Sequence, residues 1–169
     1  IGNFVVNLDS MTDLIKTIII DDEPNARQAI RNMLSMYCKG IRVVAEAESV
    51  TSGVVAISKM EPDLVLLDVE MPDGNGFDLL RKLNDIDFAV IFITAHEQYA
   101  LQAIKFSALD YILKPVNPDE LVAAVDRAVK SRKEDLILKL KSYSENTEEK
   151  NRPPRKIVLN TATNIYVIN

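Results

Sequence analysis

The sequence is poor in the residues that build disulfides and histidine-based metal centres. It holds one cysteine, Cys38, and one histidine, His96, in 169 residues. A single cysteine excludes a disulfide within the chain and suits a reducing compartment, so we expect a cytoplasmic protein. Cys38 is best explained by packing at a helix end. A lone histidine argues against a zinc site, which needs several such ligands.

Long apolar runs and nucleotide-binding glycine patterns are also missing. No run approaches the roughly 20 apolar residues that a membrane-spanning helix needs, and no basic-then-apolar leader is visible. Gly74-Asn75-Gly76 lacks the rest of a dinucleotide fingerprint and predicts a tight turn, and no P-loop is present. With 47% apolar and 27% charged residues, the composition is typical of a soluble globular protein with a proper core. We expect no membrane partner.

Charge is unevenly distributed along the chain. Residues 16–129 carry an excess of acidic side chains, and residues 130–169 an excess of basic ones. We interpret residues 1–15 as a leader. If Met11 is the natural first residue, the residues before it do not belong to the natural protein, so we leave the leader out of the predicted fold. An acidic body with a basic tail indicates two functional parts.

Short apolar runs alternate with helical patterns through the acidic part. The expected strands are 17–20, 41–47, 63–68, 88–94 and 109–113, and the expected helices are 24–38, 50–60, 77–83, 96–107 and 117–133. Five alternations predict an α/β fold: a doubly wound, five-stranded parallel sheet with helices on both faces. Ligands bind such sheets at the carboxyl ends of the strands.

The basic part has a different pattern. Residues 134–155 are polar and charged and end in Pro153-Pro154, a composition that predicts a linker. Residues 156–169 predict two strands around a polar turn. Because two strands are not stable alone, we expect them to begin a second domain.

Polar residues lie at the carboxyl ends of four of the five predicted strands. They are Asp21 and Asp22 after the first strand, Asp68 at the end of the third, Thr94 at the end of the fourth and Lys114 after the fifth. Each alone has a plain structural explanation, since acids often open loops and a lysine before proline can be a surface residue. Together they predict a site, because the strand ends meet at one edge of the sheet.

The chemistry of these residues indicates phosphoryl transfer. Three clustered carboxylates repel one another, and a hard divalent cation such as Mg²⁺ relieves the repulsion. Asp68 follows a fully apolar strand and is the best candidate for a nucleophile that becomes an acyl phosphate. The metal, Lys114 and Thr94 would each neutralise one phosphoryl oxygen.

Four motifs resemble those of a known family in order and spacing. IIIDDEP, LVLLDVEMPDGNGFDLL, FITA and DYILKP are similar to the motifs of two-component response regulator receiver domains over about residues 16–133. The resemblance implies a flavodoxin-like sheet with strand order 2-1-3-4-5. It implies Asp68 as phosphoacceptor, and Mg²⁺ (or Mn²⁺) held by Asp21, Asp22, Asp68 and the backbone carbonyl of Glu70.

The same resemblance implies further roles. Thr94 and Tyr111 would be the switch residues, Lys114 the phosphate-binding cation, and Lys114-Pro115 a cis peptide. Glu70 and His96 would tune the lifetime of the phosphate. YALQAIKFSALDYILKPV is similar to receivers of the LytTR class, and RKIVLNTATNIYVIN resembles the opening strands of the LytTR DNA-binding domain. We therefore expect residues 156–169 to begin a truncated output domain.

The expected function is signalling rather than enzymatic turnover. The resemblance implies a sensor histidine kinase as partner, a homodimer formed through the 97–130 surface after phosphorylation, and transcription regulation through the missing DNA-binding part. One alternative is a Mg²⁺-dependent aspartyl-phosphate phosphohydrolase, which would need a second acid to activate water and a cap over the substrate. The other is a receiver that acts only as an interaction module.

Overall fold

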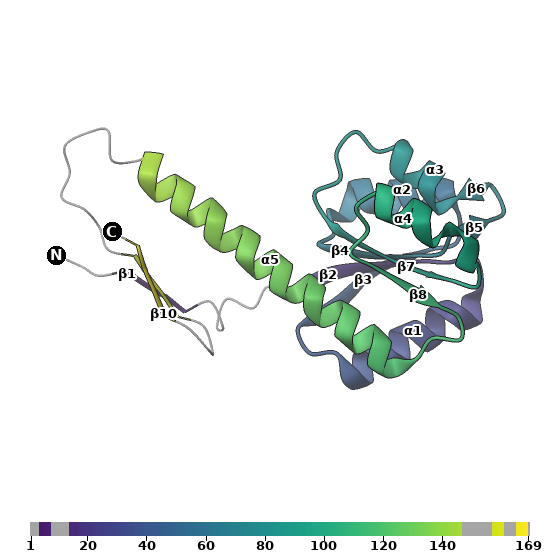
Figure 1. Cartoon of the computed structure of the whole chain (residues 1–169), viewed down its shortest axis with the longest axis horizontal. Helices are drawn as coiled ribbons and strands as arrows, with labels where there is room; N and C mark the ends of the chain where they lie inside the picture. The colour runs from purple at the N-terminus through teal and green to yellow at the C-terminus, as the bar shows by residue number, and fades with distance from the viewer. Residues whose placement is uncertain (1–3, 8–13, 147–156, 161–164, 169) are drawn as a thin grey trace. The chain divides into compact units, whose positions relative to one another are not determined.

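The computed structural model describes residues 4–7, 14–146, 157–160 and 165–168, with side chains within 14–139 and at Ser142. The chain divides into two compact units, residues 14–130 and residues 1–13 with 131–169 (Figure 1). In the described part of the chain, no helix is both long and apolar enough to cross a membrane.

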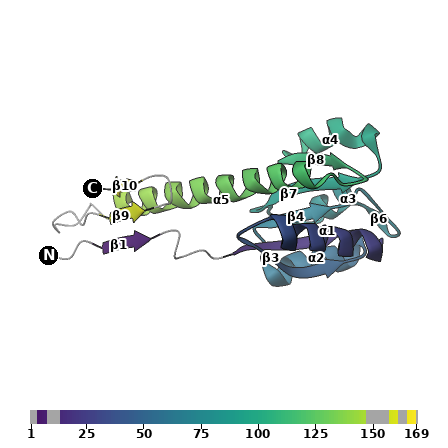
Figure 2. The same cartoon turned by 90° about the horizontal axis from the view of Figure 1, so that it is seen from below.

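A five-stranded parallel sheet forms the centre of the 14–130 unit. Its strands are β2 (Ile15–Ile20), β3 (Ile41–Ala47), β4 (Leu64–Leu67), β7 (Ala89–Thr94) and β8 (Asp110–Leu113). They lie side by side in the order β3-β2-β4-β7-β8, with β8 at one end and β3 at the other in Figure 2. Counted along the chain within this sheet, the order is 2-1-3-4-5, so the predicted fold is confirmed.

Helices cover both faces of the sheet. They are α1 (Pro24–Tyr37), α2 (Val50–Met60), α3 (Gly76–Arg81), α4 (Ala100–Lys105) and α5 (Pro118–Asn146), with a 3₁₀ turn η1 (Glu97–Tyr99) before α4. The helices α1 and α5 lie on one face and α2, α3 and α4 on the other (Figure 1). Local sequence sets the starts: Pro24 occupies the first turn of α1, and Ser49 and Asn75 close capping boxes at α2 and α3.

The core has two layers because side chains alternate along each strand. Ile18 and Ile20 of β2 pack under α2 and α3 with Phe77 and Phe92. On the opposite face, Ile19 packs in the cluster that includes residues of α1 and α5. All four residues of β4 are buried, as its unbroken apolar run predicts.

The loop after β4 is more ordered than the sequence suggested. It contains two short antiparallel strands, β5 (Glu70–Met71) and β6 (Gly74–Asn75). The Asp73 carboxylate accepts hydrogen bonds from the backbone N–H groups of Val50, at 2.7 Å, and Thr51, at 2.9 Å. The hairpin is therefore tied to the start of α2.

The predicted end of the last helix was wrong. It was placed at residue 133, whereas α5 continues to Asn146, so residues 134–146 of the predicted linker are helical. The charged residues there are good helix formers, and no proline or glycine interrupts them before Pro153. The rest of the predicted linker, 147–155, lies outside the described residues.

The second unit contains a small sheet. The strands β9 (Ile157–Asn160) and β10 (Ile165–Ile168) pair antiparallel, as expected for residues 156–169. A third strand, β1 (Phe4–Asn7), pairs parallel with β9, although the leader was left out of the predicted fold. Whether these strands begin a DNA-binding domain stays a prediction.

Candidate functional site

A pocket of about 430 Å³ opens at the carboxyl ends of the strands. This is the edge where parallel-sheet proteins bind ligands. Its lining comes from the loops after β2, β4, β7 and β8. The lining residues are Asp22, Glu23, Asp68, Glu70, Met71, Pro72, Ala95, His96 and Lys114.

Asp21 lies directly after β2 and is 1% exposed. Its backbone N–H still donates to the Ala47 carbonyl at 3.1 Å, so the residue continues the sheet geometry. Its carboxylate accepts a hydrogen bond from the Glu23 N–H at 2.9 Å. This local turn brings the chain into α1 and directs the acids toward the strand ends.

Asp68 lies directly after β4 and is 6% exposed. Its N–H donates to the Ile20 carbonyl at 2.8 Å, and its Oδ1 accepts from the Val69 N–H at 2.6 Å. Gly76 passes close behind: a Cβ there would lie 2.6 Å from the Asp68 carbonyl oxygen. The Asp68 backbone is thus held by its neighbours, and the Val69 N–H bonds Oδ1 of the carboxylate, which leaves Oδ2 for other partners.

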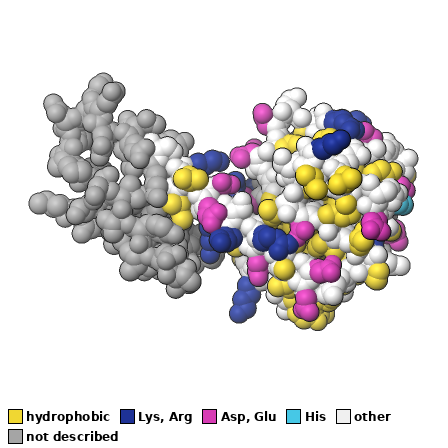
Figure 3. All heavy atoms as spheres, viewed as in Figure 1, with side chains coloured by type: hydrophobic (Ala, Val, Ile, Leu, Met, Phe, Trp, Pro, Cys, Tyr) yellow, Lys and Arg dark blue, Asp and Glu magenta, His cyan; other side chains and the backbone are white. Residues whose placement is uncertain are grey.

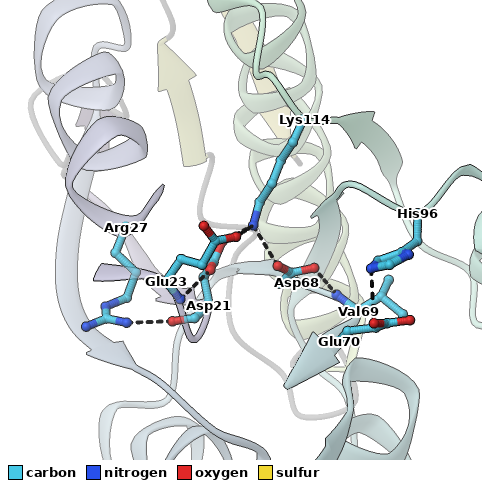
Figure 4. Close-up of polar contacts among 8 residues, drawn as sticks. All are labelled: Asp21, Glu23, Arg27, Asp68, Val69, Glu70, His96 and Lys114. Atoms are coloured by element: carbon cyan, nitrogen blue, oxygen red, sulfur yellow. Dashed lines mark hydrogen bonds and ion pairs between the residues drawn. The ribbon is translucent and has the colours of Figure 1, made fainter. Parts of the chain in front are cut away.

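Lys114 reaches across the sheet edge to these acids (Figure 4). Its Nζ lies 2.7 Å from Asp68 Oδ2, 2.8 Å from Asp21 Oδ2 and 3.3 Å from Glu23 Oε1. Its backbone N–H donates to the Thr94 carbonyl at 2.8 Å. The Lys114-Pro115 peptide is cis, as predicted.

Burial and ion pairing oppose each other at these groups. Desolvation raises the pKa of Asp21 above its ordinary value, although the Lys114 ammonium and the Glu23 N–H act against the rise. Burial would lower the pKa of Lys114, but its bonds to Asp21 and Asp68 outweigh that effect and raise it. Lys114 therefore stays charged at neutral pH.

Three carboxylates surround this single ammonium. Oxygens of Asp21, Glu23 and Asp68 all lie within 4.8 Å of one another. Two oxygens facing each other across Mg²⁺ are about 4.2 Å apart, because each Mg–O distance is about 2.1 Å. An all-oxygen donor set with excess negative charge fits a hard divalent cation.

The structure adds Glu23 to the residues that sequence reasoning selected. Asp22 lines the pocket, but the third member of the close carboxylate group is Glu23. The signal was present as a third consecutive acid, and the sequence gives no criterion for choosing among the three. Asp22 and the Glu70 carbonyl stay predictions as metal ligands.

The two predicted switch residues do not line the pocket. Thr94 is 0% exposed, and its hydroxyl makes no hydrogen bond to any residue that the structure describes. The Tyr111 hydroxyl donates to the His96 backbone carbonyl, and its ring lies 6.0 Å from that of Phe92. Desolvation, followed by the charge of Asp68, raises the pKa of Tyr111.

His96 and Glu70 meet at the pocket mouth. Nε2 of His96 lies 3.1 Å from Oε2 of Glu70, as Figure 4 shows beside Asp68. His96 Nδ1 is also 3.5 Å from the side-chain amide of Gln98. Both residues line the pocket together with Asp68.

Comparison with known proteins places the chain in a family. The model of the response regulator receiver domain matches residues 17–126. The chain belongs to the response regulator receiver family. Receiver domains are signalling proteins rather than conventional enzymes, and they generally bind Mg²⁺ at an acidic pocket.

Individual relatives agree with this assignment. The sensory transduction protein LytT of Enterococcus faecalis is 34% identical over 153 residues, which cover 89% of this chain and 60% of the relative. The transcriptional regulatory protein BtsR of Escherichia coli is 34% identical and covers 74% and 53%, respectively. The chain thus spans between half and two thirds of the length of these relatives.

A solved structure supports the same fold. The REC domain of AraT, a response regulator from Geobacillus stearothermophilus, superposes with a TM-score of 0.65 at 28% identity. The superposition covers 72% of this chain and 98% of that domain. The chain contains a receiver domain, and its curated relatives include proteins of the LytT type.

Proposed function

We propose that Asp68 accepts a phosphoryl group from a phosphohistidine of a sensor histidine kinase. An Asp68 carboxylate oxygen attacks phosphorus, the bond between phosphorus and the histidine nitrogen breaks, and the nitrogen keeps the electron pair. The observation that carries this proposal is the contact of Lys114 Nζ with Asp68 Oδ2 at 2.7 Å inside an acidic cluster.

The neighbouring groups have distinct roles in this proposal. Lys114 neutralises one phosphoryl oxygen, since its ammonium already faces the acceptor carboxylate. The Val69 N–H holds Oδ1 of Asp68 and orients the nucleophile. Mg²⁺ or Mn²⁺, when held by Asp21, Asp22, Asp68 and the Glu70 carbonyl with Glu23 close by, supplies further charge neutralisation.

Phosphorylation acts on Thr94 and Tyr111. The Thr94 hydroxyl turns toward a phosphoryl oxygen, and the Tyr111 ring follows into the space behind it. The buried Thr94 hydroxyl, which has no partner among the described residues, supports this step because any accessible acceptor would satisfy it. Glu70 and His96, paired at the mouth, set the lifetime of the phosphate by limiting access of water.

Intact-mass measurement tests the phosphoacceptor. The chain is incubated with Mg²⁺ and acetyl phosphate, and we expect a mass gain of one phosphoryl group that Asp68→Asn abolishes. Asp85→Asn, in the exposed loop after α3, is the matched control and keeps the gain. Phosphate release without accumulation would indicate a phosphohydrolase, and no reaction would indicate an interaction module.

The dimer surface includes exposed aliphatic side chains on α4 and β8. Leu101 is 76% exposed, Ile104 71% and Leu113 40%, and Figure 3 shows hydrophobic side chains over this part of the molecule. These residues lie within the 97–130 surface. Exposed apolar side chains on α4 and β8 support an interface in this surface rather than a solvated face.

Sedimentation with the phosphoryl mimic BeF₃⁻ tests the dimer. We expect Mg²⁺ and BeF₃⁻ to shift the wild-type chain from monomer to dimer, and Ile104→Asp to prevent the shift. Val55→Asp changes an aliphatic residue that is 62% exposed on α2 and should leave it intact. If Ile104→Asp still dimerises, the interface does not include Ile104.

The complete protein is proposed to regulate transcription in the cytoplasm. The relative BtsR is named a transcriptional regulatory protein, and LytT a sensory transduction protein. The strands β9 and β10 would begin the LytTR-type part that contacts DNA. Gel-shift measurements on a chain extended beyond Asn169, with and without phosphorylation, test this step.

A further inference from the structure

Arg27 contacts the acidic loop from behind the pocket. Its Nη1 donates to the backbone carbonyl of Asp21 at 2.6 Å, and its Nε lies 3.3 Å from Oε2 of Glu46. The Arg27 side chain is only 14% exposed. Figure 4 shows the guanidinium on the side of Asp21 away from Lys114.

The Asp21 carbonyl needs such a donor. β2 ends at Ile20, so the ladder of the sheet does not continue to this oxygen, although the Asp21 N–H still bonds to Ala47. A carbonyl next to a buried side chain is costly to leave without a partner. Arg27 supplies the donor from the first turns of α1.

Glu46 holds Arg27 in place. It lies on β3, opposite Ile19 of β2, and its second oxygen, Oε1, accepts from Arg31 Nε at 2.6 Å. The Arg27 guanidinium therefore links a helix, the neighbouring strand and the loop that carries the acids. Its planar fork allows both bonds at once, which a lysine ammonium could not reproduce with the same geometry.

We propose that Arg27 is a positioning residue for the cation site. By fixing the peptide after Asp21, it fixes the direction of the Asp21 and Glu23 carboxylates, although it contacts neither carboxylate. The affinity of the pocket for a divalent cation then depends on the Arg27–Asp21 carbonyl bond. This inference rests on the proposed function in so far as the acidic cluster binds such a cation.

Electrostatics alone makes the opposite prediction. Arg27 is a cation near the pocket, so removing its charge should strengthen the binding of another cation. Removing a positioning contact should weaken it. Arg31 is the matched control, because it pairs with the same Glu46 and makes no contact with Asp21 in the described structure.

Manganese binding measures the effect without phosphoryl transfer. Mn²⁺ is titrated into the full 169-residue chain, and the free ion is followed by electron paramagnetic resonance. We expect Arg27→Met to raise the Kd about tenfold, the usual lower size of such supporting contacts. Arg31→Met should leave the Kd unchanged or lower it, and Arg27→Lys should restore only part of the affinity.

A second readout separates binding from chemistry. In phosphorylation by acetyl phosphate, the half-saturating Mg²⁺ concentration of Arg27→Met should rise, while the rate at saturating Mg²⁺ stays near wild type. A general loss of stability would not raise the half-saturating Mg²⁺ concentration while leaving the rate at saturating Mg²⁺ unchanged. If Arg27→Met does not fold, Glu46→Gln tests the positioning role instead, and we expect it to raise the Kd for Mn²⁺ about threefold.

The outcomes separate the inference from the function. If the wild-type chain binds Mn²⁺ and Arg27→Met binds it with an equal or lower Kd, the positioning role is overturned and the cation site is not. If Arg27→Met is unfolded, an unchanged Kd in Glu46→Gln overturns it. Absence of Mn²⁺ binding by the wild-type chain overturns the cation site and the inference with it.

Discussion

The two sides of the pocket differ in how firmly they are held. On the acid side, the carboxylates of Asp21 and Asp68 accept hydrogen bonds from the Glu23 and Val69 N–H groups, and Arg27 holds the Asp21 carbonyl. On the switch side, the Thr94 hydroxyl is buried without a partner in the described structure. The Tyr111 hydroxyl makes one bond, to a backbone carbonyl.

This difference indicates a division of work. Groups that bind a cation and orient a nucleophile gain from being fixed before the reaction. Groups that report the reaction must change position at little cost. Lys114 joins the two sides, since its N–H bonds to Thr94 and its ammonium to Asp21 and Asp68.

Among the tests of this comparison between the two sides, the largest effect is expected at Lys114. Lys114→Met keeps most of the side-chain length and removes the charge, so phosphorylation by acetyl phosphate should slow about 10²-fold. The measurement is the initial rate of the intact-mass gain. Lys105→Met, at an exposed position of α4, should react normally, and a near-normal rate for Lys114→Met would contradict the assigned role.

Rigidity behind Asp68 can be tested at Gly76. A Cβ at Gly76 would lie 2.6 Å from the Asp68 backbone oxygen, whereas at Gly53 it would meet the end of the Leu79 side chain at the same distance. A backbone atom cannot shift as easily as the end of a side chain. We therefore expect Gly76→Ala to lower the free energy of unfolding, measured in urea, by about 1–3 kcal/mol. Gly53→Ala should lose less; equal losses would show that the loop is not fixed.

Two buried threonines test the poised state of the switch side. Thr17 and Thr94 are both 0% exposed, but only Thr17 has a described hydrogen bond, to the Ile15 carbonyl at 3.2 Å. Thr94→Val should stabilise the unphosphorylated chain by about 1 kcal/mol, and Thr17→Val should destabilise it by a similar amount. Urea midpoints measure both, and a loss of stability in Thr94→Val would mean that its hydroxyl is already satisfied.

The smallest effect concerns the hairpin beside Asp68. Hydrogen bonds from the Thr51 N–H and hydroxyl, and from the Val50 N–H, lower the pKa of Asp73 below its ordinary value of 3.8. A lowered pKa stabilises the fold above 3.8, and that contribution is lost as the pH falls through the folded-state value.

Thermal unfolding of Asp73→Asn against wild type tests this linkage. The difference in Tm should be largest near neutral pH and should close as the pH falls below 3.8. Asp85→Asn reports the general effect of removing one negative charge. A difference that widens in acid would contradict the assigned bonds.

Much of the fold could be predicted because the periodicity is strong. The bounds expected for β3 and α2 are those observed. The strand β4 was predicted from an unbroken apolar run, which is typical of a strand with helices on both faces of its sheet. The end of α5 was not predicted, since charge density alone cannot distinguish a solvated helix from a linker. The hairpin of β5 and β6 has too few residues to show a period.

Part of the site could be predicted because the strand ends could be predicted. Strand ends placed Asp21, Asp68 and Lys114 at one edge, and the structure joins them through the Lys114 ammonium. The contacts of Glu23 and Arg27 could not be predicted. They depend on how α1 is set against the β2 and β3 strand ends, a distance that no local pattern encodes.

By itself, the sequence determined which residues can be buried and where each strand ends, because side-chain alternation and chain breakers act over a few residues. It thereby determined the parallel sheet and the edge that carries the acids. Only the tertiary structure decided which acid joins Asp21 and Asp68, which cation holds the loop, and which buried hydroxyl has no partner in the described part of the chain. Those outcomes depend on contacts between distant segments, where a shift of one ångström makes or breaks a bond.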